Sequence, residues 1–349
     1  MVDIGSLLIF VIMKSILVTG GTGYIGSHTV IELHNAGYRP IVIDNLSNSH
    51  KGVVQGIESV TEKKLNWYEG DCRSERFLND VFQKHKDIQG VIHFAACKAV
   101  GESVNNPMKY YDNNIVSLLQ VLNVMKAHDV YDMVFSSSCT VYGQPDELPV
   151  TENSRWKKAN SPYGHTKQIC EQILKDLTAS NLSFTSAILR YFNPIGAHPS
   201  ATIGELPNGV PDNLIPFLTQ VAAGIRESLT VFGSDYSTID GTCVRDYIHV
   251  VDLAKAHVKA LEWTNSHPGE IDAFNIGTGN GNSVKEVVET FQKVNGIELH
   301  VLYGDRRPGD IAQIYANCDK ATDKLHWTAE HSLEDALKHA WKWQKKLGK

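Results

Sequence analysis

Two patterns of apolar residues alternate along the first half of the chain. Short runs rich in β-branched residues, bounded by glycine or polar residues, predict buried strands. These runs are Ser15–Thr19, Pro40–Asp44, Gly90–Phe94, Met133–Ser136 and Ser186–Arg190. They are separated by longer segments with helical spacing of apolar residues, namely the stretch that closes at Ala36–Gly37, Glu75–His85, Tyr111–His128 and Tyr163–Thr178. Because strands and helices alternate, we predict an α/β fold whose parallel sheet is covered by helices on both faces.

The pattern changes after Phe192, where loops rich in Gly, Pro and Asn become frequent. The helices expected beyond this point are shorter, for example Leu214–Gly224 and Val284–Asn295. We therefore predict a first domain over residues 14–193 and a smaller C-terminal α/β region over 194–349. The division is not a clean cut, since residues 245–250 and 273–277 resemble strands that return to the first sheet.

Composition excludes several classes of protein. The 349 residues include 42% hydrophobic and 21% charged residues, which is typical of a soluble globular protein. A net charge of −6 argues against nucleic-acid binding, and no run of about 18 apolar residues predicts a membrane span. The six cysteines are far apart and form no C-x-x-C pair, so we expect reduced thiols in a cytoplasmic protein and no metal site. Residues 1–12 lack the basic start and cleavage site of a signal peptide, and we expect an extension outside the domain.

A glycine-rich turn follows the first predicted strand. Gly20, Gly23 and Gly26 fit the G-x-x-G-x-x-G pattern, and a helix is expected directly after them. Glycines at these places let the backbone approach a pyrophosphate, whose charge then lies at a helix N-terminus. Asp44 ends the next strand, where a carboxylate accepts hydrogen bonds from an adenosine ribose and repels a 2′-phosphate. The pattern favours a Rossmann-type doubly wound sheet that binds NAD, and the alternative is a purely structural turn with a solvated Asp44.

A tyrosine and a lysine are spaced for general-base catalysis. Tyr163 and Lys167 lie four residues apart at the start of a predicted helix, which places both side chains on one face. The lysine charge and a bound oxidised nicotinamide would both favour the phenolate and lower the pKa of Tyr163. Ser138 closes a run of three serines at the carboxyl end of a predicted strand, and it could share the proton of the reacting hydroxyl. Taken alone, the spacing also fits an ordinary exposed pair, but Pro162 suits a helix start and supports the catalytic interpretation.

With these residues assembled, the sequence resembles the extended short-chain dehydrogenase/reductase family, in particular its nucleotide-sugar epimerases. The resemblance runs from Lys14 to about Gln344. It rests on the motifs VTGGTGYIGSHT, DNLSNS, GDCR, HFAACKAVGES, FSSSCTVYG, SPYGHTK, RYFNPIGAH, VRDYIHVVDLA and RRPGD. Two departures occur: Ala96-Cys97 stands where the family usually has Gly-Leu, and His165-Thr166 stands where it usually has Lys-Ser.

The resemblance implies roles for individual residues. The catalytic group would be Ser138, Tyr163 and Lys167. NAD would be bound by Gly20, Gly23, Tyr24, Ile25, Gly26, Asp44, Asn45, Ser49, Asp71, Cys72, Phe94, Ala95, Lys98, Asn113 and Tyr191, together with Tyr163 and Lys167. The UDP-sugar would be bound by Ser138, Tyr163, Asn193, Asn213, Phe232, Arg245, Arg307 and Asp310, with the two arginines on the diphosphate because guanidinium binds phosphate oxygens bidentately.

The implied activity is reversible epimerisation at C4 of a UDP-hexose, UDP-galactose to UDP-glucose, in galactose metabolism. Tyr163 would remove the 4-hydroxyl proton as C4 gives hydride to NAD, and the 4-keto sugar would turn over and take it back on the other face. One alternative is a nucleotide-sugar 4,6-dehydratase or decarboxylase, although dehydratases place an Asp-Glu pair where Cys139-Thr140 follows Ser138 here. Another is a non-catalytic NAD-binding regulator, although such relatives typically lose the Tyr/Lys pair.

Two points stay open on sequence alone. Ile314 occupies a position where the family varies between a tyrosine and a small residue that limit bulk at the sugar C2. Its intermediate size leaves N-acetylated sugars undecided. The family often forms homodimers through paired helices, and the apolar stripe within Asn114–Met125 suits such a contact, although a helix facing the core explains the stripe equally well.

Overall fold

The computed structural model describes residues 13–181, 183–307 and 310–348, and the extension predicted over 1–12 lies outside the described residues. The strands are β1 (Ser15–Thr19), β2 (Arg39–Asp44), β3 (Asn66–Glu69), β4 (Ile88–His93), β5 (Asp132–Ser136), β6 (Thr185–Tyr191), β7 (Asn193–Ile195), β8 (Leu229–Phe232), β9 (Val244–Arg245), β10 (Tyr247–His249), β11 (Ile271–Ile276), β12 (Asn282–Ser283), β13 (Val301–Gly304) and β14 (Gln313–Ile314). The helices are α1 (Tyr24–Asn35), α2 (Gly52–Thr61), α3 (Glu75–Lys84), α4 (Val100–Asn105), α5 (Pro107–Ala127), α6 (Pro162–Ser180), α7 (Leu214–Ala222), α8 (Val250–Ser266), α9 (Val284–Asn295), α10 (Asp319–Leu325) and α11 (Leu333–Leu347), with a 3₁₀ helix, η1 (Cys139–Tyr142).

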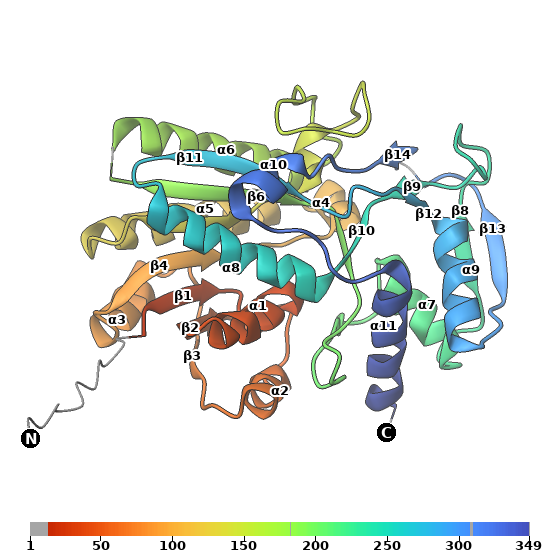
Figure 1. Cartoon of the computed structure of the whole chain (residues 1–349), viewed down its shortest axis with the longest axis horizontal. Helices are drawn as coiled ribbons and strands as arrows, with labels where there is room; N and C mark the ends of the chain where they lie inside the picture. The colour runs from red at the N-terminus through yellow and green to blue at the C-terminus, as the bar shows by residue number, and fades with distance from the viewer. Residues whose placement is uncertain (1–12, 182, 308–309, 349) are drawn as a thin grey trace, which may run out of the picture.

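Seven parallel strands form the central sheet in the order β11-β6-β5-β4-β1-β2-β3 (Figure 1). The order starts at β1, runs outward through β2 and β3, and then resumes on the other side of β1 with β4. The crevice at the carboxyl ends of β1 and β4 is therefore the place where a doubly wound sheet binds its ligand. The predicted Rossmann-type fold is confirmed.

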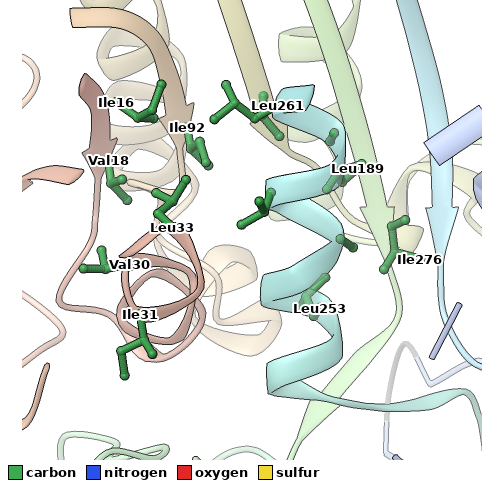
Figure 2. Packing of buried hydrophobic residues seen from close by; sticks show 14 of the residues in the cluster. Ile16, Val18, Val30, Ile31, Leu33, Ile92, Leu189, Leu253, Leu261 and Ile276 are labelled. Carbon is green, nitrogen blue, oxygen red and sulfur yellow. The ribbon is translucent and has the colours of Figure 1, made fainter. Parts of the chain in front are cut away.

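Alternating side chains of the strands face two layers of helices. On one face, Ile16 and Val18 of β1 pack with Leu33 of α1 and Leu253 and Leu261 of α8 in a fully apolar cluster (Figure 2). On the other face, the intervening Leu17 joins a second cluster, to which α3, α5 and α6 contribute Leu78, Leu118 and Leu174. Burial on both faces explains why these strands are continuous apolar runs.

A third apolar cluster lies outside the large sheet. It joins α7, α9 and α11 to β8, which pairs in parallel with β13. In Figure 1 these elements lie together at the end of the molecule away from β1 and α3. Two further small sheets, β10-β7 and β12-β9-β14, connect this end to the large sheet. The division into domains at residue 193 stays a prediction.

The two returning strands have different outcomes. The segment at 273–277 is confirmed, because β11 pairs with β6 at the edge of the large sheet. The prediction for 245–250 is wrong: β9 pairs with β12 and β14, and β10 pairs with β7. The reason is that β11 already occupies the free edge of β6, so β10 pairs instead with β7, which continues the chain beyond β6. Among the described residues, no helix is long and apolar enough to cross a membrane.

Candidate active site

The glycine turn between β1 and α1 leaves room for a ligand that approaches the backbone. Gly20 has a φ of +67°, and a Cβ there would lie 2.9 Å from the Ala95 nitrogen. A Cβ on Gly26 would lie 2.3 Å from the Gly20 carbonyl oxygen, so the helix can start this close to the turn only with glycine. Gly23 is the N-cap of α1 and provides no side-chain cap, so no side chain occupies the first amides of the helix. These features fit a pyrophosphate.

Asp44 closes the turn from the neighbouring strand. Its Oδ2 accepts a hydrogen bond from the Thr22 amide at 3.1 Å, and its Oδ1 accepts one from Ser49 Oγ, also at 3.1 Å. The hydroxyls of Thr22 and Ser49 lie 2.8 Å apart. Asp44 is therefore held beside the glycine turn at the end of β2, as its predicted role on the ribose requires. Thr22 is a support that sequence reasoning missed, because its amide carries no side-chain signal.

The residues predicted to border the adenine form a second group. Asn45 Nδ2 donates to Asp71 Oδ2 at 3.4 Å, and Asp71 forms an ion pair with Arg73 at 2.8 Å. This contact with Arg73 holds the pKa of Asp71 below its usual range. Cys72 is buried, and burial raises the pKa of its thiol to about 12, so it stays a neutral wall residue.

Residues after β4 approach the turn from the other side. The Phe94 amide donates to the Thr19 carbonyl oxygen at 3.1 Å, and the Ala95 amide donates to Thr19 Oγ1 at 3.2 Å. Tyr24, in the first turn of α1, donates its hydroxyl to the Gly196 carbonyl at 2.7 Å, and the next residue, Ile25, packs against the apolar core. These contacts fix the cofactor side of the site to three different parts of the chain.

Two predicted binding residues meet on one carboxylate that the sequence analysis did not consider. Lys98 Nζ lies 3.3 Å from Glu205 Oε1, and Asn213 Nδ2 donates to the same oxygen at 2.7 Å. Lys98 was predicted to bind the cofactor and Asn213 the sugar nucleotide, so Glu205 joins the two halves of the predicted site.

Asn113, predicted to lie on the nicotinamide side, donates from Nδ2 to Asn114 Oδ1 at 3.0 Å.

Lys167, the lysine of the predicted catalytic pair, is fixed at the end of β5. Lys167 is buried, and its Nζ donates to the Ser136 carbonyl oxygen at 2.7 Å and lies 4.8 Å from the centre of the Phe135 ring. Burial lowers the pKa of Lys167 to about 8. The ammonium form of Lys167 is therefore less strongly favoured at neutral pH than that of an exposed lysine.

Tyr163 lies on the same buried face of α6, near Ser138 and Tyr191. Pro162 opens this helix, and the Ser161 hydroxyl caps it by accepting from the Gly164 amide at 3.2 Å. Burial raises the pKa of Tyr163 well above 10; nearby Tyr191 adds to the rise and the Ser138 side chain opposes it. Burial, and not the charge of Lys167, determines the direction of this pKa shift in the fold. A phenolate here needs a further positive charge beside it.

Three of the residues predicted to bind the substrate lie together in the structure, and Arg245 and Asn193 lie on separate strands. Phe232, Arg307 and Asp310 lie together: Arg307 is 5.8 Å from the Phe232 ring centre, and its Nη2 is 3.1 Å from Asp310 Oδ1. Arg245 belongs to the sheet β12-β9-β14, where it lies opposite Ile314. Asn193 opens β7.

Residues 16–277 match the NAD dependent epimerase/dehydratase family, which is three quarters of the chain. The chain belongs to this family.

Curated relatives match this chain almost from end to end. The UDP-glucose 4-epimerase of Bacillus subtilis is 51% identical over 330 residues, which cover 95% of this chain and 96% of the relative. The enzyme of that name from Dictyostelium discoideum is 49% identical, with 94% and 95% covered. The crystal structure of the Bifidobacterium longum UDP-glucose 4-epimerase in complex with NAD⁺ and UDP has a TM-score of 0.91 at 46% identity, covering 95% of this chain and 98% of that chain.

One buried carboxylate of this family member was missed by sequence reasoning. Asp246 is fully buried between β9 and β10. Its Oδ1 accepts from the amide and the hydroxyl of Thr278, each at 2.8 Å, and its Oδ2 accepts from the amides of Gly279 at 3.1 Å and Ala316 at 3.2 Å. These four bonds tie the loops after β11 and β14 to the strand of Arg245. The available signal was an acid directly after Arg245, between two short segments that are rich in apolar residues.

Proposed function

We propose that the protein catalyses the reversible epimerisation of UDP-galactose and UDP-glucose at C4, with NAD bound throughout the cycle. The observation that carries the proposal is the burial of Tyr163, Lys167 and Ser138 together at the carboxyl edge of the sheet that also holds the glycine turn. End-to-end likeness to proteins named UDP-glucose 4-epimerase, at 51% and 49% identity, supports the same activity.

The residues around the turn fit NAD. The room at Gly20 and Gly26 suits its pyrophosphate, and the fixed carboxylate of Asp44 suits an adenosine ribose. When bound, NAD supplies an acceptor for the hydride of the sugar C4 and later a donor that returns it. Its nicotinamide ring is positively charged when oxidised, which is the charge that Tyr163 needs.

Each residue of the catalytic group then has a separate task. Tyr163 is the general base for the 4-hydroxyl proton and, in the return step, the acid that gives it back. Lys167 stabilises the phenolate by its charge, and it is held for this by the Ser136 carbonyl. Ser138 orients the hydroxyl. Arg245 and Arg307 hold the diphosphate, so that binding energy is gathered away from the carbon that must present both faces.

A dehydratase has weaker support. Ser138 is followed by η1, whose first residue is Cys139. Burial raises the pKa of the Cys139 thiol to about 12, so this group is a poor acid for a leaving hydroxyl at C6.

The cellular setting is part of the proposal. We place the enzyme in the cytoplasm, in galactose metabolism, and its six cysteines are all free thiols in the structure. We also propose a homodimer. In the stripe within α5, Leu118, Leu122 and Met125 face the core, which leaves Leu119, 41% exposed, for contact with a second copy. Sedimentation of the purified protein at several concentrations tests this state.

The activity is tested by incubating the pure protein with UDP-galactose and no added cofactor. We expect UDP-glucose to form, and NAD to be released when the protein is denatured. Tyr163→Phe keeps the ring but removes the base; a loss of about 10²-fold to 10⁴-fold in kcat is expected for a missing general base. Wild-type protein that contains NAD and yet leaves UDP-galactose unchanged would contradict the proposal.

A further inference from the structure

A buried ion pair lies directly behind the catalytic group. Glu171 and Arg190 have side-chain exposures of 0% and 3%, and no other ion pair among residues 13–181, 183–307 and 310–348 excludes water from both partners to this degree. Arg190 Nη2 lies 2.7 Å from Glu171 Oε2, and its Nε donates to both carboxylate oxygens, at 3.1 Å and 3.2 Å. Desolvating two charges makes such a pair a weak source of stability compared with apolar side chains of the same volume. A positional role explains its presence better.

The carboxylate also takes a hydrogen bond from the serine run. Ser137 Oγ donates to Glu171 Oε1 at 2.6 Å, and the Ser137 amide donates to the Leu189 carbonyl oxygen on β6 at 2.9 Å. Ser137 is therefore fixed from two sides, by the strand that carries Arg190 and by the helix that carries Glu171. Such double attachment leaves the backbone at this residue little freedom.

The neighbours of Ser137 are the residues that contact the catalytic pair. The Ser136 carbonyl oxygen accepts a hydrogen bond from Lys167 Nζ, and the Ser136 hydroxyl donates one to the Tyr191 hydroxyl at 3.2 Å. Ser138 follows Ser137 and lies near Tyr163, whose pKa its side chain lowers. Adjacent residues of an extended chain point to opposite sides. Anchoring the Ser137 side chain on one side therefore fixes the positions of Ser136 and Ser138 on the other side.

We propose that Glu171, held by Arg190, is a positioning residue: through Ser137 it sets where the Ser136 carbonyl meets Lys167 and where the Ser138 hydroxyl meets Tyr163. This inference rests on the proposed function for its catalytic consequence, but the contacts it invokes belong to the chain itself. Glu171 lies one helical turn after Lys167, so the same helix carries both the ammonium group and the residue that positions its acceptor.

Charge adds a second consequence. The carboxylate of Glu171 raises the pKa of Lys167 against the larger effect of burial. The other titratable groups that act on this cluster are Cys170, beside Lys167, His93 on β4, and Tyr142, Glu152 and Lys175 around the ion pair. Neutralising Glu171 alone leaves the Arg190 charge uncompensated, and the ammonium form of Lys167 is then disfavoured.

Three variants of the NAD-loaded enzyme separate position from charge. Ser137→Ala removes the anchoring hydroxyl and leaves the ion pair intact. Glu171→Gln removes the charge, and Glu171→Gln combined with Arg190→Met removes both charges, which keeps the test usable where the single change fails to fold. The measurements are kcat and KM for UDP-galactose across pH, NAD content, and the ultraviolet titration of Tyr163 against a Tyr163→Phe blank.

For Ser137→Ala we expect a fall in kcat of about tenfold, the size of a small misplacement of reacting groups, with KM and NAD content unchanged. The Tyr163 titration should move to higher pH, because the Ser138 side chain lowers the pKa of Tyr163. For Glu171→Gln we expect a larger fall in kcat. The alkaline limb of the pH profile, where Lys167 loses its proton, should shift to lower pH. In the double variant with Arg190→Met this limb should return toward its wild-type position. If Ser137→Ala keeps the kcat and the Tyr163 titration of the wild type, the proposal is overturned. If the wild type itself leaves UDP-galactose unchanged, the proposed function fails, while the tyrosine titration still decides the positioning role.

Discussion

Replacing Asp246 by asparagine tests how the substrate side of the site is held in place. The carboxylate accepts four hydrogen bonds, two on each oxygen, from Thr278, Gly279 and Ala316. Asparagine keeps one acceptor oxygen but turns an amide NH₂ toward two donors. At about 1.5–3 kcal/mol for each hydrogen bond to a charged group, loss of two amounts to about 3–6 kcal/mol. We expect this loss to lower the unfolding free energy and to loosen the segments that the carboxylate ties, one of which carries the buried Ile314 and Ala316.

The consequence for function follows from what these loops hold. Ala316 lies two residues after Ile314, which is opposite Arg245. Loosening β14 therefore moves Arg245, which we propose to bind the diphosphate, and we expect weaker UDP binding with NAD content unchanged. Calorimetric titration with UDP and urea unfolding measure the two effects. Thr278→Val is the matched control: it removes one of the four donors, leaves the carboxylate in place, and should cost about 1.5–3 kcal/mol, half of the loss expected for Asp246→Asn. Wild-type UDP affinity and unfolding free energy in Asp246→Asn would refute the reasoning.

The other predictions concern the cofactor, the sugar and acid stability. Gly26→Ala places a Cβ 2.3 Å from the Gly20 carbonyl oxygen, so the purified variant should contain little NAD, as measured after denaturation; full NAD content would contradict the packing argument. Ile314 is buried on β14, opposite Arg245 of β9. Ile314→Tyr should lower turnover of N-acetylated UDP-sugars more than that of UDP-galactose. An equal loss on both sugars would show that this side chain does not face C2. Burial lowers the pKa of His28 and of His93 to about 3 each, below the value of about 6.5 in the unfolded chain. Between pH 6.5 and about 3 the unfolded chain therefore binds more protons than the folded one. The unfolding free energy falls as the pH drops through this window. From pH 6.5 to 5 each should cost about 2 kcal/mol, and an unfolding free energy that is constant over this range, measured by urea titration, would argue against buried neutral rings.

The large sheet was predictable because its strands are buried on both faces. Continuous apolar runs mark such strands directly, and the runs expected around β1, β2, β4, β5 and β6 are all found within a few residues of their predicted bounds. The strand β3 escaped notice because it lies at the edge of the sheet and its sequence, Asn66–Glu69, mixes an amide, two aromatics and an acid. Helix α8 begins with Val250 and Val251, which continue the β-branched pattern of the strand before it and hide the helix start.

The site divides along the same line. The turn at Gly20–Gly26 and the pair on α6 are local patterns, so spacing alone brings their residues together. The contact of Lys98 and Asn213 on Glu205, and that of Glu171 with Arg190, join segments that no local period relates. Such long-range polar contacts depend on how the helices and small sheets pack on the large sheet, and a single sequence carries no direct signal of that packing.

The residues proposed to react and those proposed to bind the diphosphate are held in place differently, which suggests how one fold can act on a loosely held sugar. The reacting groups stand on the large sheet and α6, where burial and the ion pair behind Ser137 leave them little freedom. The residues that we propose to bind the diphosphate lie elsewhere: Arg245 stands on the sheet β12-β9-β14, beside the loops tied to Asp246, and Arg307 follows the end of β13. Changes to the first set should therefore appear mainly in kcat, and changes to the second mainly in KM and UDP affinity. A sugar that must present both faces to one base is best served by this separation, because the anchor can bind tightly without restricting the ring.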